Sequence, residues 1–217
     1  MFYLEQHRYK TKTIEPNILL KLYGSGKRDF SLIDLAQRSL SEVNLTEIEL
    51  WRANLTEINL SHTILQKANL KECNLTGATL WRTNFQQANL TKAQFNHGMV
   101  IGANFSHSIL NKSWFKNTDL RLACLKKADL RGANLSGANL SYANLNLANL
   151  SGADLSHAIL TGACLDRTNL TNTNLEGTIL EGIDFRQSIL PTKADLGKSR
   201  LICNKVNVIR GTQLSSN

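Results

Sequence analysis

A repeat of five residues is the feature that most constrains the fold of this chain. Every fifth residue from Phe30 to Leu190 is Leu, Phe or Val, which makes 33 consecutive positions, 26 of them Leu. A small residue usually stands two places before this central residue, Asn or Asp stands one place before it, and Gly often stands two places after it. The segment Ala133-Asn134-Leu135-Ser136-Gly137 contains the whole unit. Self-similarity of this kind indicates a repeat architecture.

A period of five excludes the two ordinary secondary structures. In an α-helix, steps of five residues would scatter the leucines around the cylinder, and in a straight strand they would place successive leucines on opposite faces. The chain must therefore turn once per unit, with the central and the small residue pointing inward. Asn, Asp and Gly suit such turns because they tolerate a positive φ. Stacked coils then bond backbone to backbone and form a solenoid.

These residues resemble the pentapeptide-repeat proteins, whose unit reads A(N/D)LXX. The resemblance covers about three quarters of the chain and implies an all-β solenoid, namely a right-handed quadrilateral β-helix with one unit per wall. The length of the repeat gives about eight to nine coils of about twenty residues each. The segment from Leu19 to Phe30 is similar to the helix-then-repeat opening of cyanobacterial members, some of which regulate cell differentiation.

The sequence divides into three segments: an N-terminal tail and helical cap over residues 1–27, the β-helix over residues 28–190, and a C-terminal segment over residues 191–217. In the last segment the motif returns one residue late, at Ala194-Asp195-Leu196, which predicts either a further coil or an irregular cap. The prolines at positions 16 and 191 bracket the repeat.

The N-terminal segment combines a tail with a short helix. Apolar residues at helical spacing predict a helix over residues 16–23, which would cover the first coil and block end-to-end association. Residues 1–12 show no periodicity, and we expect them to be unordered. Arg38 occupies a position where a small inward residue is normal, so we expect a partly open first coil, because an unpaired arginine is not buried.

Composition favours a cytoplasmic protein with no membrane association. No apolar run approaches the roughly 20 residues that span a bilayer, and the first residues lack an export signal. The four cysteines form no CxxC pair, and we expect reduced thiols. The net charge of +8 lies in the ends of the chain, because residues 1–27 carry +3, residues 191–217 carry +4 and the repeat region carries only +1.

No pattern in the sequence points to catalysis, a metal or a cofactor. The five histidines do not share a wall at adjacent coils, and Cys124 and Cys164 lie two coils apart on one wall, too far for a disulfide or a shared zinc ion. Nucleophile-elbow, phosphate-loop and dinucleotide motifs are absent. We therefore expect a protein that is not an enzyme and needs no cofactor.

Sorting the outward positions by a repeat of twenty places apolar and arginine side chains on one wall across four successive coils. The candidate partner-binding residues are Trp81, Arg82, Met99, Ile101, Arg121, Leu122 and Tyr142. Exposed apolar patches mark interaction sites, and Trp, Tyr and Arg are enriched at binding hot spots. The pattern predicts an interaction scaffold or regulator that docks a partner protein through this wall, as a monomer or an end-to-end dimer. Ordinary surface is the alternative, since isolated exposed apolar residues are common.

Two other functions follow from charge. Nucleic acid could bind through the basic termini, and a basic band rings one coil, with Asp119 and Asp129 as its only acidic neighbours. The band consists of Lys112, Lys116, Arg121, Lys126, Lys127 and Arg131. Some members of the resembled family imitate DNA to bind gyrase, which requires a strongly acidic tower, whereas this repeat region is close to neutral.

Overall fold

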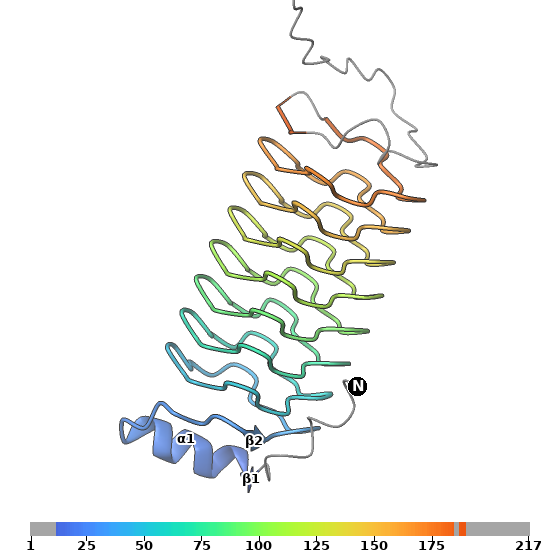
Figure 1. Ribbon diagram of the computed structural model, residues 1–217. Coiled ribbons are helices and arrows are strands. Elements are labelled where there is room, and N and C mark those ends of the chain that lie inside the picture. Colours follow the sequence, from blue (N-terminus) through green and yellow to red (C-terminus); the bar gives the residue numbers. More distant parts are fainter. Residues whose placement is uncertain (1–11, 185–186, 190–217) are drawn as a thin grey trace, which may run out of the picture.

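The computed structural model describes residues 12–184 and 187–189. Strand β1 (Lys12–Thr13) and helix α1 (Pro16–Gly24) precede strand β2 (Ile33–Asp34), and the chain then winds upward as a tower of stacked coils (Figure 1). The predicted β-helix is confirmed, and it is a right-handed quadrilateral β-helix.

The register between coils is constant along the tower. The residue before each central residue forms a parallel bridge with the residue twenty positions later, as in Asn54 to Asn74 and onward to Gln94. Four units of five therefore make one coil, and Phe30 to Ile189 gives eight coils. A further coil after Pro191, which the returning motif predicts, would lie outside the described residues.

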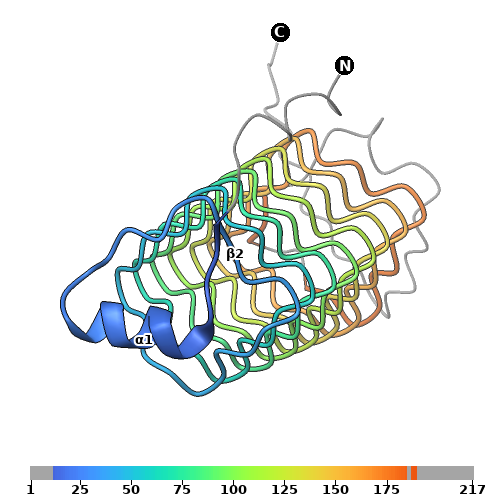
Figure 2. The same ribbon diagram turned by 90° about the horizontal axis from the view of Figure 1, so that it is seen from below.

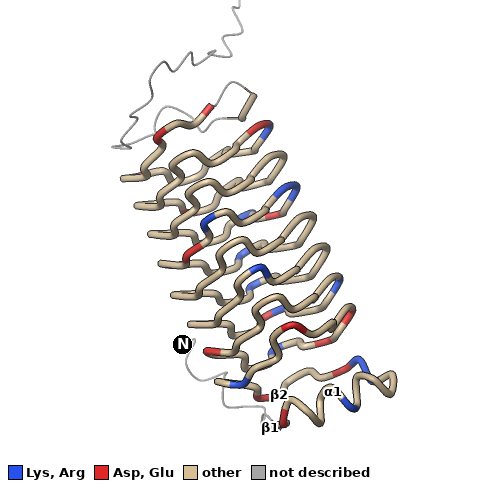
Figure 3. Tube along the Cα trace, turned by 180° about the vertical axis from the view of Figure 1, so that it is seen from behind, with Lys and Arg blue, Asp and Glu red and all other residues tan. Residues whose placement is uncertain are grey.

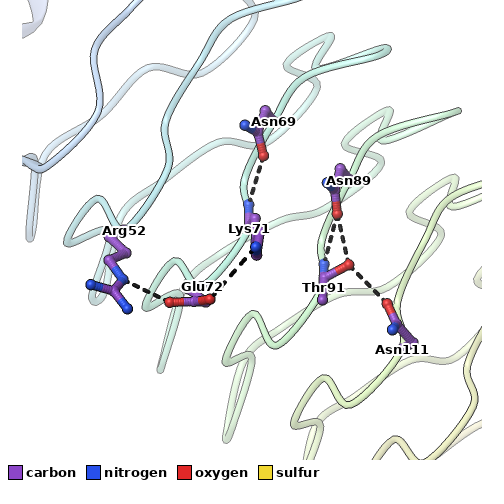
Figure 4. Close-up of polar contacts among 7 residues, drawn as sticks. All are labelled: Arg52, Asn69, Lys71, Glu72, Asn89, Thr91 and Asn111. Atoms are coloured by element: carbon purple, nitrogen blue, oxygen red, sulfur yellow. Dashed lines mark hydrogen bonds and ion pairs between the residues drawn. The ribbon is translucent and has the colours of Figure 1, made fainter.

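Where Asn or Asp precedes the central residue, its side chain stabilises the turn that follows. Its side-chain oxygen accepts a hydrogen bond from the backbone N–H two residues later, as Asn59 Oδ1 does from Ser61 at 3.0 Å. Figure 4 shows the same contact from Lys71 to Asn69 and from Thr91 to Asn89. This is an Asx turn, which replaces a backbone turn contact with a side-chain contact.

The expectation that Asn and Asp stand in the repeat because they tolerate a positive φ is wrong. Positive φ falls on the second residue after the centre, where side chains such as Arg82 (φ 52°) and Tyr142 (φ 59°) adopt it. Gly recurs at this same position, for example Gly162 with φ 67°, so the expectation holds for glycine. The coil-to-coil bonds of the neighbouring residues hold the other side chains in a conformation that they would otherwise avoid.

The core is a column of central residues lined by small inward residues. Leu55, Leu60 and nearly every other central residue in the described tower are buried. Inward threonines also fit, because Thr83 Oγ1 donates a hydrogen bond of 2.8 Å to the carbonyl oxygen of Leu60 in the coil below. Among the described residues, no buried side-chain nitrogen or oxygen lacks a partner. The polar side chains of the described core therefore keep their hydrogen bonds when they are buried, so their burial does not destabilise the fold.

Four phenylalanines fill the middle of the tower. Phe85 stacks on Phe105 with ring centroids 4.9 Å apart, and Phe95 stacks on Phe115 at 4.5 Å, while rings from the two stacks meet edge-on. Each stack joins residues twenty positions apart, as the register of the coils requires. Gly98 makes room for the backbone there, since a Cβ at this position would lie 2.9 Å from the Phe95 carbonyl oxygen.

Removing one ring from this stack should destabilise the tower strongly. We expect Phe105→Ala to cost about 3–5 kcal/mol, because it removes a fully buried side chain and leaves a cavity that the stacked coils cannot close. Urea denaturation followed by circular dichroism measures the change. The control Leu147→Ala removes an exposed side chain and should shift stability by less than about 1 kcal/mol. Equal effects of the two substitutions would contradict this account of the core.

Helix α1 lies against the lower end of the tower, as the sequence predicts (Figure 2). Leu19 is fully buried in the core, and the Tyr23 hydroxyl donates a hydrogen bond of 2.8 Å to the carbonyl oxygen of Thr46. Arg38 pairs with Glu15 at 2.9 Å, so this arginine is not buried without a partner, as expected. Its carbonyl oxygen accepts the ordinary coil-to-coil hydrogen bond from Asn59, so the backbone of the first coil is not opened at this position. These contacts fix the helix to the first coil.

Strand β1 departs from the sequence prediction. Lys12 was expected to belong to an unordered tail, but it pairs in parallel with Ile33 of β2, and Thr13 pairs with Asp34. The strand thus covers part of the first coil's backbone edge that the helix leaves open. A strand of two residues is too short to show a periodic sequence pattern, so the sequence could not predict it. The strand forms because the first coil has an unpaired backbone edge at Ile33 and Asp34. Residues 1–11 lie outside the described residues.

Loosening the helical cap should expose the first coil to other molecules. We expect Leu19→Asp to detach α1, because it would bury a charge, and to cause association that increases with protein concentration. Light scattering after size-exclusion chromatography measures this. Ile18→Asp is the matched control, since Ile18 is 49% exposed on the same helix and should leave the protein unassociated. An unassociated Leu19→Asp protein would show that α1 does not protect this end.

Candidate interaction site

The predicted partner-binding residues come together at one wall and its edge. Each unit places three residues on a wall and two in the following turn. Met99 lies in the middle of a wall, between Thr79 below and Asp119 above. The other members occupy the turns along the edge of that wall. We call this set the apolar edge: Trp81, Arg82, Met99, Ile101, Arg121, Leu122 and Tyr142.

The apolar edge is exposed over four coils. Leu122 and Tyr142 are 62% and 64% exposed, Met99 is 50% and Trp81 is 44% exposed, whereas Ile101 is half-buried. The backbone register stacks these turns directly, because the Arg82 N–H bonds to the Ile101 carbonyl and the Leu122 N–H bonds to the Ser141 carbonyl. The result is a row of mostly apolar side chains on a backbone that is hydrogen-bonded from coil to coil.

Two arginines give this line its polar character. The guanidinium of Arg82 lies 5.1 Å from the centre of the Trp81 ring, while His62 meets the same ring edge-on at 5.0 Å. Arg121 binds the Asp119 carboxylate through Nε and Nη2 at 2.9 and 2.7 Å. This hydrogen bonding raises the pKa of the Arg121 guanidinium above its ordinary value. Arg121 is thus locally neutralised, and Arg82 supplies the positive charge of the edge.

Glycine shapes the upper part of the apolar edge. Gly162 stands one coil above Tyr142, and a Cβ there would lie 2.7 Å from the Tyr142 Cε1 atom. The absence of a side chain at Gly162 therefore gives the Tyr142 ring room to lie against this turn, while the residue stays 64% exposed. A tyrosine ring has few rotatable bonds, so it loses little conformational entropy on binding.

Sequence reasoning missed two exposed apolar side chains near the same height. Trp114 is 51% exposed and Ile109 is 44% exposed, each in the middle of a different wall of the tower. The search for a shared wall passed over them, because each stands alone in its column between polar residues. Their unit position, which normally carries Asn or Asp, was the available signal.

Charges of both signs occur along the tower (Figure 3). In the predicted basic band, Asp129 binds Arg131 at 2.7 Å, which lowers the pKa of the Asp129 carboxyl, and Asp119 binds Arg121 in the same way. Within the described residues, the four lysines of the band form no ion pair. The band encircles one coil, so no single wall presents all of its charges.

The structure offers no assembled metal or redox centre in the part of the chain that it describes. No three His, Cys, Asp or Glu side chains gather there in a way that would hold a metal ion. Cys73, Cys124 and Cys164 are free thiols. Across residues 12–184 and 187–189, no helix has the length and apolar character that crossing a membrane requires.

The cysteines should differ sharply in reactivity. Burial raises the pKa of Cys73 to about 12, and its Sγ donates to the Leu50 carbonyl, so at about pH 8 it stays protonated and shielded. Cys164 is exposed. We expect iodoacetamide to alkylate Cys164 in the native protein and Cys73 only after unfolding, as measured by peptide mass spectrometry. Equal labelling of both thiols in the native state would contradict the closed core.

Comparison with known proteins identifies the family to which this sequence belongs. The sequence matches the family profile described as pentapeptide repeats, with 8 copies, over residues 39–77, 68–99, 101–137, 133–172 and 168–202. The chain belongs to the pentapeptide-repeat family. The last matched segment extends beyond Pro191, where the sequence predicts a late return of the motif. A search of curated proteins found no match.

Solved structures of the same family resemble this one. HetL, a pentapeptide repeat protein involved in heterocyst differentiation regulation from the cyanobacterium Nostoc sp. strain PCC 7120, is 26% identical, with a TM-score of 0.56 over 87% of this chain and 95% of HetL. A pentapeptide repeat protein from the Arabidopsis thaliana thylakoid lumen is 32% identical over 48% of this chain and 65% of its own, with a TM-score of 0.39. QnrB1, a plasmid-mediated fluoroquinolone resistance protein, is 17% identical over 74% and 92%, with a TM-score of 0.46.

Proposed function

We propose that this protein is a non-enzymatic scaffold that binds a partner protein through the apolar edge and thereby regulates it. The observation that carries the proposal is the gathering of apolar side chains over four coils, in which Trp81, Met99, Leu122 and Tyr142 are exposed. Most other turns of the tower carry Ser, Thr, Asn, Gly or charged residues at these positions. Exposed apolar side chains gathered in this way mark interaction surfaces.

The chemistry of the edge suits binding of another protein. Trp, Tyr and Arg are the residue types that dominate binding energy, and the edge contains Trp81, Tyr142 and Arg82. The backbone behind them is held by hydrogen bonds from coil to coil, so little ordering accompanies binding. The paired Arg121 adds a planar group that can stack on a partner without introducing an unpaired charge.

The regulatory part of the proposal rests on the likeness to HetL, which is involved in heterocyst differentiation regulation and covers nearly the same length of chain. We place this protein in cell differentiation or signalling on that basis, acting in the cytoplasm. Nucleic-acid binding through the basic termini is the alternative, since residues 1–27 carry a net charge of +3 and residues 191–217 carry +4. DNA imitation is disfavoured by the repeat region's charge of +1.

A pull-down with matched variants tests the apolar edge. Nuclease-treated lysate from the native source is passed over the wild-type protein and over the edge variant, in which Trp81, Ile101, Leu122 and Tyr142 are all changed to Ser. We expect a specific protein to be lost, at least about tenfold, from the edge variant because its apolar anchors are gone. Circular dichroism first confirms that both proteins are folded.

The control for this experiment removes exposed apolar side chains elsewhere on the tower, in the variant Ile64→Ser/Ile109→Ser/Leu147→Ser. It should retain the partner. Identical proteins on the wild type and both variants would refute the edge as a docking surface. In a separate measurement with labelled nucleic acid, binding by the wild type and both variants that falls steeply from low to moderate salt would favour nucleic-acid binding through the termini instead.

A further inference from the structure

We propose that a second docking face, separate from the apolar edge, binds an acidic segment of a partner protein. This Trp114 face is centred on Trp114, and its edges carry Lys92, Lys112, Lys116 and Arg131. It occupies the wall formed by residues 93–95, 113–115 and 133–135, whereas Met99 and the apolar edge belong to the next wall and the turn beyond it. The two faces can therefore be altered independently.

Trp114 stands on a rigid platform. It bridges in parallel to Gln94 below and Asn134 above, and 51% of its surface is exposed. Directly inside the same wall, the rings of Phe95 and Phe115 stack at 4.5 Å and are fully buried. The coil-to-coil bridges and the packed rings behind the wall make it rigid. The Trp114 backbone therefore loses little conformational entropy when the indole binds a partner.

Lysines flank the indole on both sides. Lys112 lies in the turn that precedes Trp114, and Lys116 lies in the turn that follows it. Lys92 stacks one coil below Lys112, and the Lys112 side chain rises over Gly132, with its Cγ 3.7 Å from the place of a Cβ on that glycine. In the described chain, these three lysines form no ion pair, whereas Arg131 binds Asp129.

No carboxylate interrupts this face over three coils. The segments 91–97, 111–117 and 131–137 contain no Asp or Glu. The sign changes just beyond them, because Glu72 lies one coil below Lys92 and Asp154 lies one coil above Asn134. Glu72 is already held by Arg52 at 2.6 Å (Figure 4). At about 4.8 Å per coil, the positive region is about 10 Å tall.

These features together select a short acidic protein segment. Carboxylates would approach the three unpaired lysines while one apolar side chain packs on Trp114, a combination of complementary charge and a central aromatic anchor. A nucleic-acid strand fits less well, because strand binding uses successive aromatic side chains and a basic track, and this face has one indole and meets carboxylates within a coil on either side.

A displayed library of random twelve-residue peptides tests this inference on the full-length protein. Peptides that also bind Lys112→Glu/Lys116→Glu are removed, and the enriched sequences are synthesised with a fluorescent label for anisotropy measurements. We expect them to be rich in Asp and Glu around an aromatic or aliphatic residue. Their Kd should rise at least about tenfold on Trp114→Gln, a variant that plays no part in the selection.

The matched control is Lys126→Glu/Lys127→Glu, which makes the same charge change on the opposite corner of the same coil and should alter the Kd less than twofold. The four-serine edge variant should bind these peptides normally, because it leaves the Trp114 face unchanged. Failure of the proposed function would therefore not refute this inference, and failure of this inference would not refute the proposed function. Three results would overturn it: no enriched sequence, equal weakening by the control, or tighter binding of a twelve-nucleotide single-stranded DNA that Trp114→Gln abolishes.

Discussion

The bond between one coil and the next is the constraint on which the rest of this structure depends. Backbone N–H groups such as that of Leu55 bond to carbonyl groups of the following coil, in a register of twenty residues that does not slip in the described tower. Because the register is fixed, each sequence position has one place in space. The stacked phenylalanines, the Asx turns and the positions of both proposed docking faces all follow from this regularity.

A fixed register also turns small local choices into surface features. Where the residue before the centre is Asn, its side chain is engaged in the turn, as in Asn59, and presents little to a partner. Where Met99 or Trp114 replaces it, the turn forgoes that contact and an apolar group stands on the wall. The side chains that distinguish one part of the tower from another are therefore those that depart from the repeat, because the repeat itself gives every coil the same surface.

Much of the fold and part of the site could be predicted from these departures. The stacking of Phe85 under Phe105, the helix starting at Pro16 and the outward turn of Arg38 followed from spacing and from the cost of burying charge. The run from Trp81 to Tyr142 was also visible, since a repeat of twenty assigns its heights. Whether a partner uses that run is a question of chemistry outside the chain.

The sequence by itself determined the solenoid, because a period of five leaves no alternative way to bury a leucine in every unit. Tertiary structure alone decided three matters. It paired β1 with the open edge at Ile33, it assigned Asn and Asp to turn contacts, and it left 51% of the Trp114 surface exposed on its wall. Each of these depends on which groups meet in space. The sequence pattern does not specify those contacts, because they form only when the coils have stacked.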